Sequence, residues 1–136
     1  MTREDMRLLL YAAEWTIQNH RHVMSTIREL AGSEENYLII ARELDRVNGH
    51  IARARALHAE ATLTLVEWLV IVDSYQWRCA CCQEKPFEVM HHRIPLHEGG
   101  TTLSNCLPAC RSCCTRRKKN LPDLVPLITT TENRRV

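Results

Sequence analysis

The chain has 136 residues, of which 45% are hydrophobic and 25% charged, a composition that allows one domain of ordinary size or a small domain with an appendage. No uninterrupted apolar run of 18 residues occurs, so the sequence predicts no membrane span. The segment MTREDMRLLL lacks the apolar region of a secretory signal, and we expect a cytoplasmic protein.

The formal net charge of +2 is unevenly distributed. Residues 1–74 hold 8 Lys or Arg against 11 Asp or Glu, whereas residues 75–120 hold 8 against 3. All seven cysteines also lie in the second part, between Cys79 and Cys114. In a cytoplasmic protein this crowding favours a metal site over disulfides. The positive surplus indicates a polyanionic partner, for which we expect a nucleic acid.

Residues 1–61 predict an antiparallel helical hairpin. Thr2 is a candidate N-cap, Gly32 ends the first helix, and Ser33 begins the second. Apolar or small residues recur in steps of four and three, as along a coiled-coil seam. The seam positions are Met6, Leu10, Ala13, Ile17, His20, Met24, Ile27 and Ala31, then Tyr37, Ile40, Leu44, Val47, Ile51, Ala54, His58 and Ala61. We interpret His20 and His58 as seam residues rather than ligands, and a second copy of the chain can complete the seam as a homodimer.

Residues 62–74 predict a connecting apolar helix from Leu65 to Ser74, because Thr64 and Glu67 form a capping box. One unbroken helix through residues 62–64 is the alternative. Residues 75–120 predict a small module with a strand in EVMHHRIPL, a turn at GGTT and a helix start in PACRSCC. Residues 121–136 predict an irregular tail. The predicted fold class is therefore α+β and mostly α.

Two Cys-x-x-Cys pairs, Cys79 with Cys82 and Cys110 with Cys113, supply four thiolates for a tetrahedral zinc ion. A site with four protein ligands has no open position for water, so this zinc would be structural. Cys81 and Cys106 are interpreted as small buried hydrophobes, with a shifted ligand register as the alternative.

A second group of polar residues lies between the two cysteine pairs. His91 and His92 are adjacent on the predicted strand and so point to opposite faces, where one can bind a metal and the other can face a substrate. Asn105 can fix the loop between them and the second pair. Basic residues can contact phosphates: Arg93, Arg111, Arg116, Arg117, Lys118 and Lys119.

The order C-x-x-C, HHRIPLHEGGTTLSNCLPAC, C-x-x-C and a basic run resembles the zinc-stapled form of the HNH endonuclease superfamily over residues 75–120. The resemblance implies a ββα-metal fold of two antiparallel strands and a helix around a divalent ion, usually Mg²⁺ or Mn²⁺, with Zn²⁺ or Ni²⁺ as other possibilities. It implies that His91 binds this ion, that His92 is the general base, and that Asn105 holds the base in place. The implied reaction is cleavage or nicking of DNA with little sequence specificity.

The sequence departs from the family where histidine or asparagine follows the last zinc cysteine, because Cys114 occupies that position. A thiolate suits zinc and other softer ions better than magnesium. Four possibilities stay open: a softer metal at His91 and Cys114, magnesium held by His91 with water and phosphate, a weakened nuclease, or a replacement ligand at His97 or Asn120. We expect retained activity with altered metal preference. The alternatives are a zinc-stapled DNA-binding module that does not cleave, and an assembly protein that acts through its helices.

Overall fold

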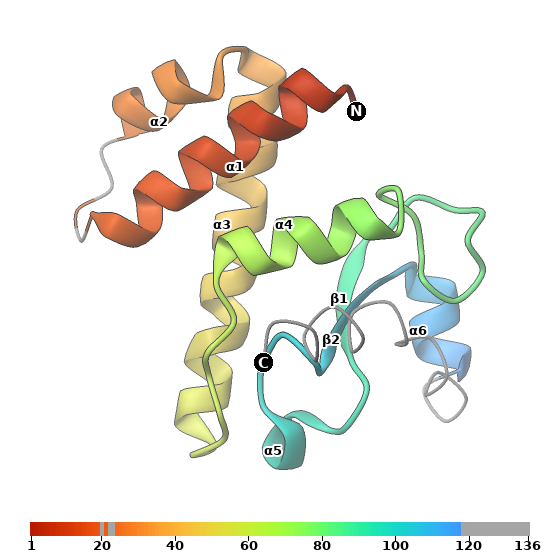
Figure 1. Cartoon of the computed structure of the whole chain (residues 1–136). Helices are drawn as coiled ribbons and strands as arrows, with labels where there is room; N and C mark the ends of the chain where they lie inside the picture. The colour runs from red at the N-terminus through yellow and green to blue at the C-terminus, as the bar shows by residue number, and fades with distance from the viewer. Residues whose placement is uncertain (20, 22–23, 118–136) are drawn as a thin grey trace.

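The computed structural model describes residues 1–19, 21 and 24–117. Four helices come first: α1 (Arg3–Gln18), α2 (Met24–Ala31), α3 (Glu34–Ala56) and α4 (Leu65–Ser74). They are followed by β1 (Val89–His92), α5 (Leu96–Gly99), β2 (Cys106–Ala109) and α6 (Arg111–Arg117) (Figure 1). We call residues 75–117 the finger. The α+β, mostly helical class is confirmed, whereas Lys118, Lys119, Asn120 and the predicted tail lie outside the described residues.

The first predicted helix is wrong in length. It ends at Gln18, and α2 begins at Met24, so two helices replace one. The reason lies at Asn19, whose backbone N–H and side-chain Nδ2 both donate to the Trp15 carbonyl oxygen, at 3.1 and 2.8 Å. Asparagine competes in this way for helical carbonyls, and its own backbone is extended here. His20, assigned to the seam, lies outside the described residues.

The residues that α1 buries also differ from the predicted heptad seam. Met6 and Ala13 are buried as predicted, but Leu9 and Ala12 are buried in place of Leu10, which is half-buried, and Ile17 is exposed. The cause is α4, which packs on α1 in addition to α2 and α3. A helix with neighbours on several sides needs a wider apolar face than a two-stranded seam provides.

The second predicted helix begins where expected but ends early. Ser33 caps it through a 3.1 Å hydrogen bond from the Asn36 N–H to its Oγ, and Gly32 has the positive φ of a helix terminator. The helix ends at Ala56, so His58, which is exposed, and Ala61 lie beyond it rather than on a seam.

The connecting helix α4 is confirmed from Leu65 to Ser74. The Glu67 N–H donates to Thr64 Oγ1 at 3.1 Å, and the Thr64 N–H donates to Glu67 Oε1 at 3.0 Å, which completes the capping box. Residues 62–64 are not helical, so the unbroken alternative is wrong.

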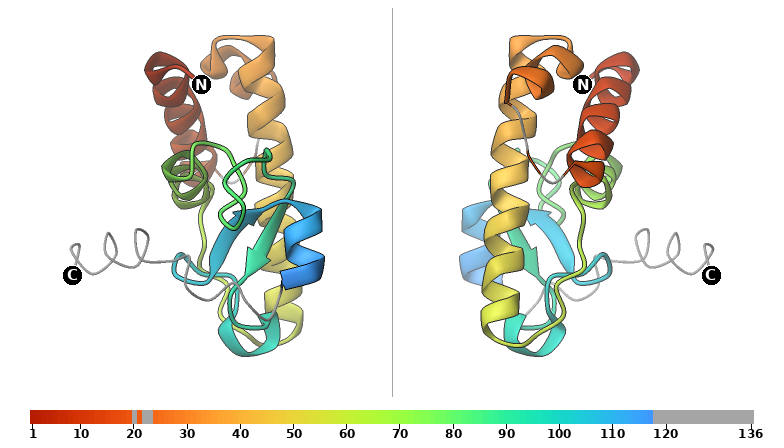
Figure 2. Two further views of the ribbon diagram at one scale, coloured as in Figure 1. Left: turned by 90° about the vertical axis from the view of Figure 1, so that its right-hand side faces the viewer. Right: turned by 90° about the vertical axis from the view of Figure 1, so that its left-hand side faces the viewer.

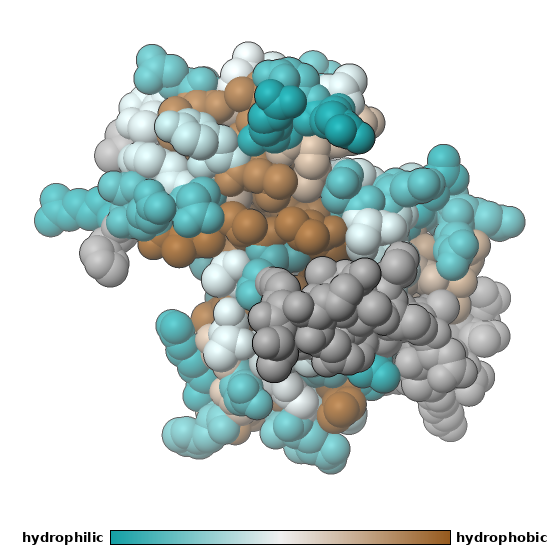
Figure 3. Space-filling view, in the orientation of Figure 1, coloured by the Kyte–Doolittle hydropathy of each residue, from teal (hydrophilic) through white to brown (hydrophobic). Residues whose placement is uncertain are grey.

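One hydrophobic core joins the helices to the finger. Trp68 and Leu69 of α4 are fully buried and belong to the same cluster as Met90 of β1 and Leu107 of β2. Figure 3 shows apolar side chains gathering over α1 and α4. In the described part of the chain, no helix is long and apolar enough to cross a membrane.

Backbone hydrogen bonds join the segment after α3 to the loop before β2. The Thr101 N–H donates to the Glu60 carbonyl oxygen at 2.8 Å, and the Thr101 carbonyl oxygen accepts from the N–H groups of Thr62 and Leu63 at 3.0 and 3.1 Å. Gly100 precedes this bridge with φ 73° and ψ −175°, a conformation open almost only to glycine. The end of α3 is thereby held against the finger.

Replacing Gly100 by alanine is expected to destabilise the protein. The backbone conformation alone costs about 1–3 kcal/mol for a residue with a Cβ, and that Cβ would overlap the Glu60 carbonyl group. Gly49→Ala is the matched control, because Gly49 lies inside α3 with no atom near the position of an added Cβ. Alanine there should raise the free energy of unfolding by about 0.5–1 kcal/mol. Urea denaturation measures the loss of stability in Gly100→Ala and the gain in Gly49→Ala. Equal stability of wild type and Gly100→Ala would contradict the close contact between Gly100 and Glu60.

Candidate metal centre and nucleic-acid site

The four predicted zinc cysteines come together in the finger. Cys79 and Cys82 lie on the turn after α4, Cys110 lies between β2 and α6, and Cys113 lies in α6. Their sulfur atoms all lie within 4.8 Å of one another. Sulfurs each about 2.3 Å from one tetrahedral zinc ion would be roughly 3.8 Å apart, so a small closure around an ion satisfies zinc geometry.

Backbone N–H groups and burial both change the properties of these sulfur atoms in ways that bear on metal binding. The Cys81 N–H donates to Cys79 Sγ at 3.3 Å, and the Cys113 N–H donates to Cys110 Sγ at 3.4 Å. Backbone N–H groups of Lys85 and Glu84 lower the pKa of Cys82 to about 7. Burial raises the pKa of the Cys79 and Cys113 thiols above the ordinary value, so a bound cation is what would stabilise them as thiolates. The donor set therefore fits a structural metal such as zinc.

Two of the three remaining cysteines, Cys81 and Cys106, are predicted not to be zinc ligands and are not among the four. Cys106 is 1% exposed in the hydrophobic core, and burial raises the pKa of its thiol to about 12, which confirms the interpretation as a buried hydrophobe. Cys81 is half-buried and packs against the four-cysteine cluster.

His91 and His92 diverge from the two-stranded sheet. The strands are antiparallel, with His91 opposite Leu107 and His92 opposite Cys106. His91 is 7% exposed, and its Nδ1 lies 3.2 Å from Cys114 Sγ of α6. An imidazole nitrogen and a sulfur this close can share one ion, and both are donors that softer divalent ions accept.

His92 faces Thr101 and helix α3 instead. Its Nε2 lies 3.0 Å from Thr101 Oγ1, which in turn lies 3.3 Å from the carbonyl oxygen of His50. A carbonyl oxygen can only accept, so both contacts are satisfied together when the Thr101 hydroxyl donates to His50 and accepts from His92 Nε2–H. The lone pair of His92 is then on Nδ1.

The sequence analysis missed His50 and Arg53, because it assigned their helix to a hairpin that serves packing rather than chemistry. The ring centroids of His50 and His92 are 5.1 Å apart, and Arg53 Nη2 donates to His50 Nδ1 at 2.5 Å. Burial lowers the pKa of both histidines to about 4, with a further contribution from the Arg53 charge, so both rings are neutral at pH 7. The spacing His50-x-x-Arg53 places the two on one helix face and was the available signal.

Asn105 clamps the loop between β1 and β2. Its Oδ1 accepts from the Ile94 N–H at 2.8 Å, and its Nδ2 donates to the carbonyl oxygens of Ile94 and Gly100 at 3.0 and 2.7 Å. The side chain is buried, so these bonds tie the end of β1 to the loop that carries Thr101.

The predicted phosphate-binding residues are described only in part. Arg93 is half-buried directly after β1, and Arg111 is exposed at the start of α6, where its backbone N–H donates to Glu88 Oε1 at 2.9 Å. Arg116 and Arg117 belong to α6, but their side chains lie outside what the structure describes.

The proposed replacement ligand His97 does not join His91 and Cys114. It is exposed on α5, where its Nε2 lies 3.4 Å from Glu98 Oε2. Within the described residues, the four cysteines are the one group of three or more potential ligands close enough to share an ion. An ion bound beside His91 would therefore have two protein donors among the described residues, His91 and Cys114.

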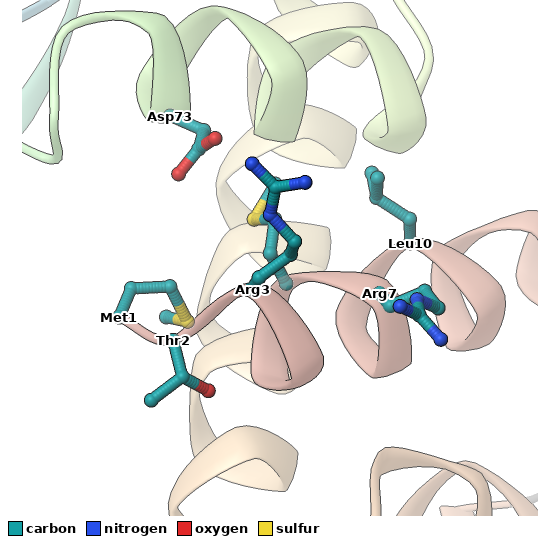
Figure 4. A pocket seen from close by; sticks show the side chains of 7 residues that line it. Met1, Thr2, Arg3, Arg7, Leu10 and Asp73 are labelled. Atoms are coloured by element: carbon teal, nitrogen blue, oxygen red, sulfur yellow. The ribbon is translucent and has the colours of Figure 1, made fainter.

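Another cavity in the described structure lies away from these residues. It has a volume of about 560 Å³ between the start of α1 and the end of α4, with Arg3, Leu10 and Asp73 among its lining residues (Figure 4). None of its lining residues is a predicted site residue. The candidate site lies instead where the finger contacts α3, around His91, His92 and His50.

No protein-family model, curated protein or solved structure matches this chain. The resemblance to the HNH superfamily stays a prediction that depends on the residues themselves.

Proposed function

We propose that the protein is a metal-dependent DNA endonuclease or nickase of the HNH type. The observation that carries the proposal is the divergence of two neighbouring histidines: His91 meets Cys114 of α6, while His92 is held by Thr101 on the other side of β1. This arrangement separates a metal-binding position from a proton-accepting position, as phosphodiester hydrolysis with an activated water requires.

His92 would act as the general base. Its Nε2–H is engaged by Thr101, so Nδ1 is the atom that would accept a proton from the attacking water. The water oxygen would form the new bond to phosphorus as the bond to the 3′ oxygen breaks, and the 3′ oxygen would leave and take up a proton. Asn105 supports this role indirectly, because its three hydrogen bonds hold the loop that positions Thr101.

His91 and Cys114 would hold the catalytic ion. Such an ion supplies polarisation of the phosphate and stabilisation of the leaving oxygen. Nitrogen and sulfur donors favour zinc or nickel over magnesium, which prefers oxygen. The four cysteines would hold a separate structural zinc.

DNA is proposed as the substrate because positive charge is concentrated in residues 75–120. Arg93 directly follows β1, and Arg111 is the first residue of α6, the two elements that carry His91, His92 and Cys114. Arginines that contact phosphates bind without reading base sequence, so low sequence specificity is expected.

The alternative is a zinc-stapled DNA-binding module that does not cleave. It is favoured by the two-donor composition of the second site in the described residues. A site with few protein ligands holds its ion weakly, and the same basic residues would still bind DNA.

Relaxation of supercoiled plasmid tests cleavage. Zinc-loaded protein is assayed with added magnesium, manganese, nickel or zinc, and we expect activity with at least one of the softer ions. His92→Ala should lower the rate about 100- to 10,000-fold, the usual contribution of a general base. His97→Ala is the matched control, since this exposed histidine pairs only with Glu98 among the described contacts and should leave the rate unchanged.

Cys114→His adds a second arm to that assay. It should shift the metal preference toward manganese or magnesium, because imidazole is a harder donor than thiolate. Intact plasmid with every ion in wild type, together with retained DNA binding, would reject the nuclease and support the non-cleaving alternative.

A further inference from the structure

Helix α3 brings a histidine and an arginine to the edge of the candidate site. The His50 ring packs against the His92 ring, and its Nδ1 accepts a hydrogen bond from Arg53 Nη2. Figure 2 shows α3 passing the two strands, with α6 on the opposite side of the strands. His50 and Arg53 come from the acidic part of the sequence, 42 and 39 residues before His92.

This position of α3 is held by contacts on both sides of His50. Toward the start of the helix, Arg46 Nη1 donates to the Glu88 carbonyl oxygen at 2.8 Å. At His50 itself, the backbone carbonyl oxygen accepts from Thr101 Oγ1, and beyond the helix Glu60 accepts from the Thr101 N–H. The segment is therefore part of the site wall.

Arg53 has donors left for a ligand. A guanidinium carries five N–H groups in one plane, and the described contact to His50 engages only Nη2. The Arg53 side chain is exposed, and none of the ion pairs within the described residues involves it. His50, as a neutral acceptor, orients the guanidinium without neutralising its charge.

We propose that Arg53, oriented by His50, binds a backbone phosphate of DNA beside the site occupied by His91 and His92. The inference rests on the proposed function in taking DNA as the ligand. The guanidinium of Arg53 is planar and permanently charged, and no carboxylate among the described ion pairs neutralises it. Such a group is suited to bind two oxygens of one phosphate. The helical part of the chain thus supplies a substrate contact to the finger.

The test measures DNA binding, which does not depend on cleavage. A short fluorescein-labelled duplex is titrated with zinc-loaded protein, without added catalytic ion, across a series of salt concentrations. Arg53→Gln should weaken binding about tenfold, and the slope of log affinity against log salt should become shallower by about 0.9, the value for one lost phosphate contact on duplex DNA. The loss should be the same for unrelated duplex sequences.

Arg55→Gln is the matched control. Arg55 is exposed on the same helix and its loss changes the net charge equally, but it lines a separate cavity of about 320 Å³ with Ile17 and Leu63. Its replacement should leave the salt slope unchanged. Arg53→Lys should retain the slope and lose part of the affinity, and His50→Phe, which retains a ring but no acceptor, should weaken binding with the arginine still present. Zinc content and thermal melting verify that each variant is folded.

The outcomes separate this inference from the nuclease. Equal binding by Arg53→Gln and Arg55→Gln overturns the Arg53 contact and leaves the cleavage assay to decide the proposed function. A specific loss in Arg53→Gln, with wild type that binds DNA but never cuts it, supports the contact and rejects the nuclease. Wild type that binds no duplex overturns both.

Discussion

Cys82→Ser is expected to abolish zinc binding and unfold the finger, whereas Cys81→Ser should leave both intact. The two cysteines are adjacent and both half-buried, but only Cys82 belongs to the group of four whose sulfurs lie within 4.8 Å. Structural zinc contributes about 10–16 kcal/mol to the folding of zinc-finger peptides at neutral pH. Because a whole domain is stable by only about 5–15 kcal/mol, loss of the ion exceeds what the short strands β1 and β2 can replace.

Zinc per chain, measured by mass spectrometry of the metal, and heteronuclear NMR of the finger amides report the two effects separately. Wild type and Cys81→Ser should each contain one tightly bound zinc, and Cys82→Ser none. Retained zinc in Cys82→Ser with loss in Cys81→Ser would show that the first pair binds in the other register. Chelation of wild type should reproduce the spectrum of Cys82→Ser.

Glu43→Ala is expected to lower the free energy of unfolding by about 3–5 kcal/mol, the usual cost of removing one partner from a buried ion pair. Glu43 is 0% exposed in α3. Its carboxylate accepts from Arg46 Nε at 2.8 Å, from Arg42 Nε at 3.0 Å and from Trp68 Nε1 of α4 at 2.9 Å. Alanine would leave the indole N–H and the mostly buried Arg46 guanidinium without this acceptor.

The effect should extend into the finger through Arg46. Its guanidinium also donates to the Glu88 carbonyl oxygen and lies over the Phe87 ring, 5.3 Å from the ring centroid. Arg42→Ala is the control, because Arg42 is an exposed partner of the same carboxylate and should cost about 0–1 kcal/mol. Urea denaturation measures the free energy of unfolding of both variants. A similar decrease in Glu43→Ala and Arg42→Ala would mean that the buried Glu43 carboxylate contributes little to stability.

Short-range signals in the sequence predicted what depends on neighbouring residues. The capping box of Thr64 and Glu67 predicted the start of α4, since both partners lie within one helical turn. The four cysteines were identified because each pair lies on one tight turn. The divergence of His91 and His92 follows from the alternation of side chains along any strand. The end of α1 was missed because a single asparagine outweighed an otherwise continuous apolar pattern.

By itself, the sequence therefore determined the four-cysteine cluster, helix α4 and the pair of histidines. Only the tertiary structure decided that α3 lies against the finger and that α4 covers Glu43. The physical reason is that Glu43, His50 and Arg53 occupy positions outside the heptad seam, which periodicity assigns to solvent. Whether a polar side chain on such a face is buried or adjoins a site depends on what packs there, and here the partners are 25 to 51 residues away in sequence.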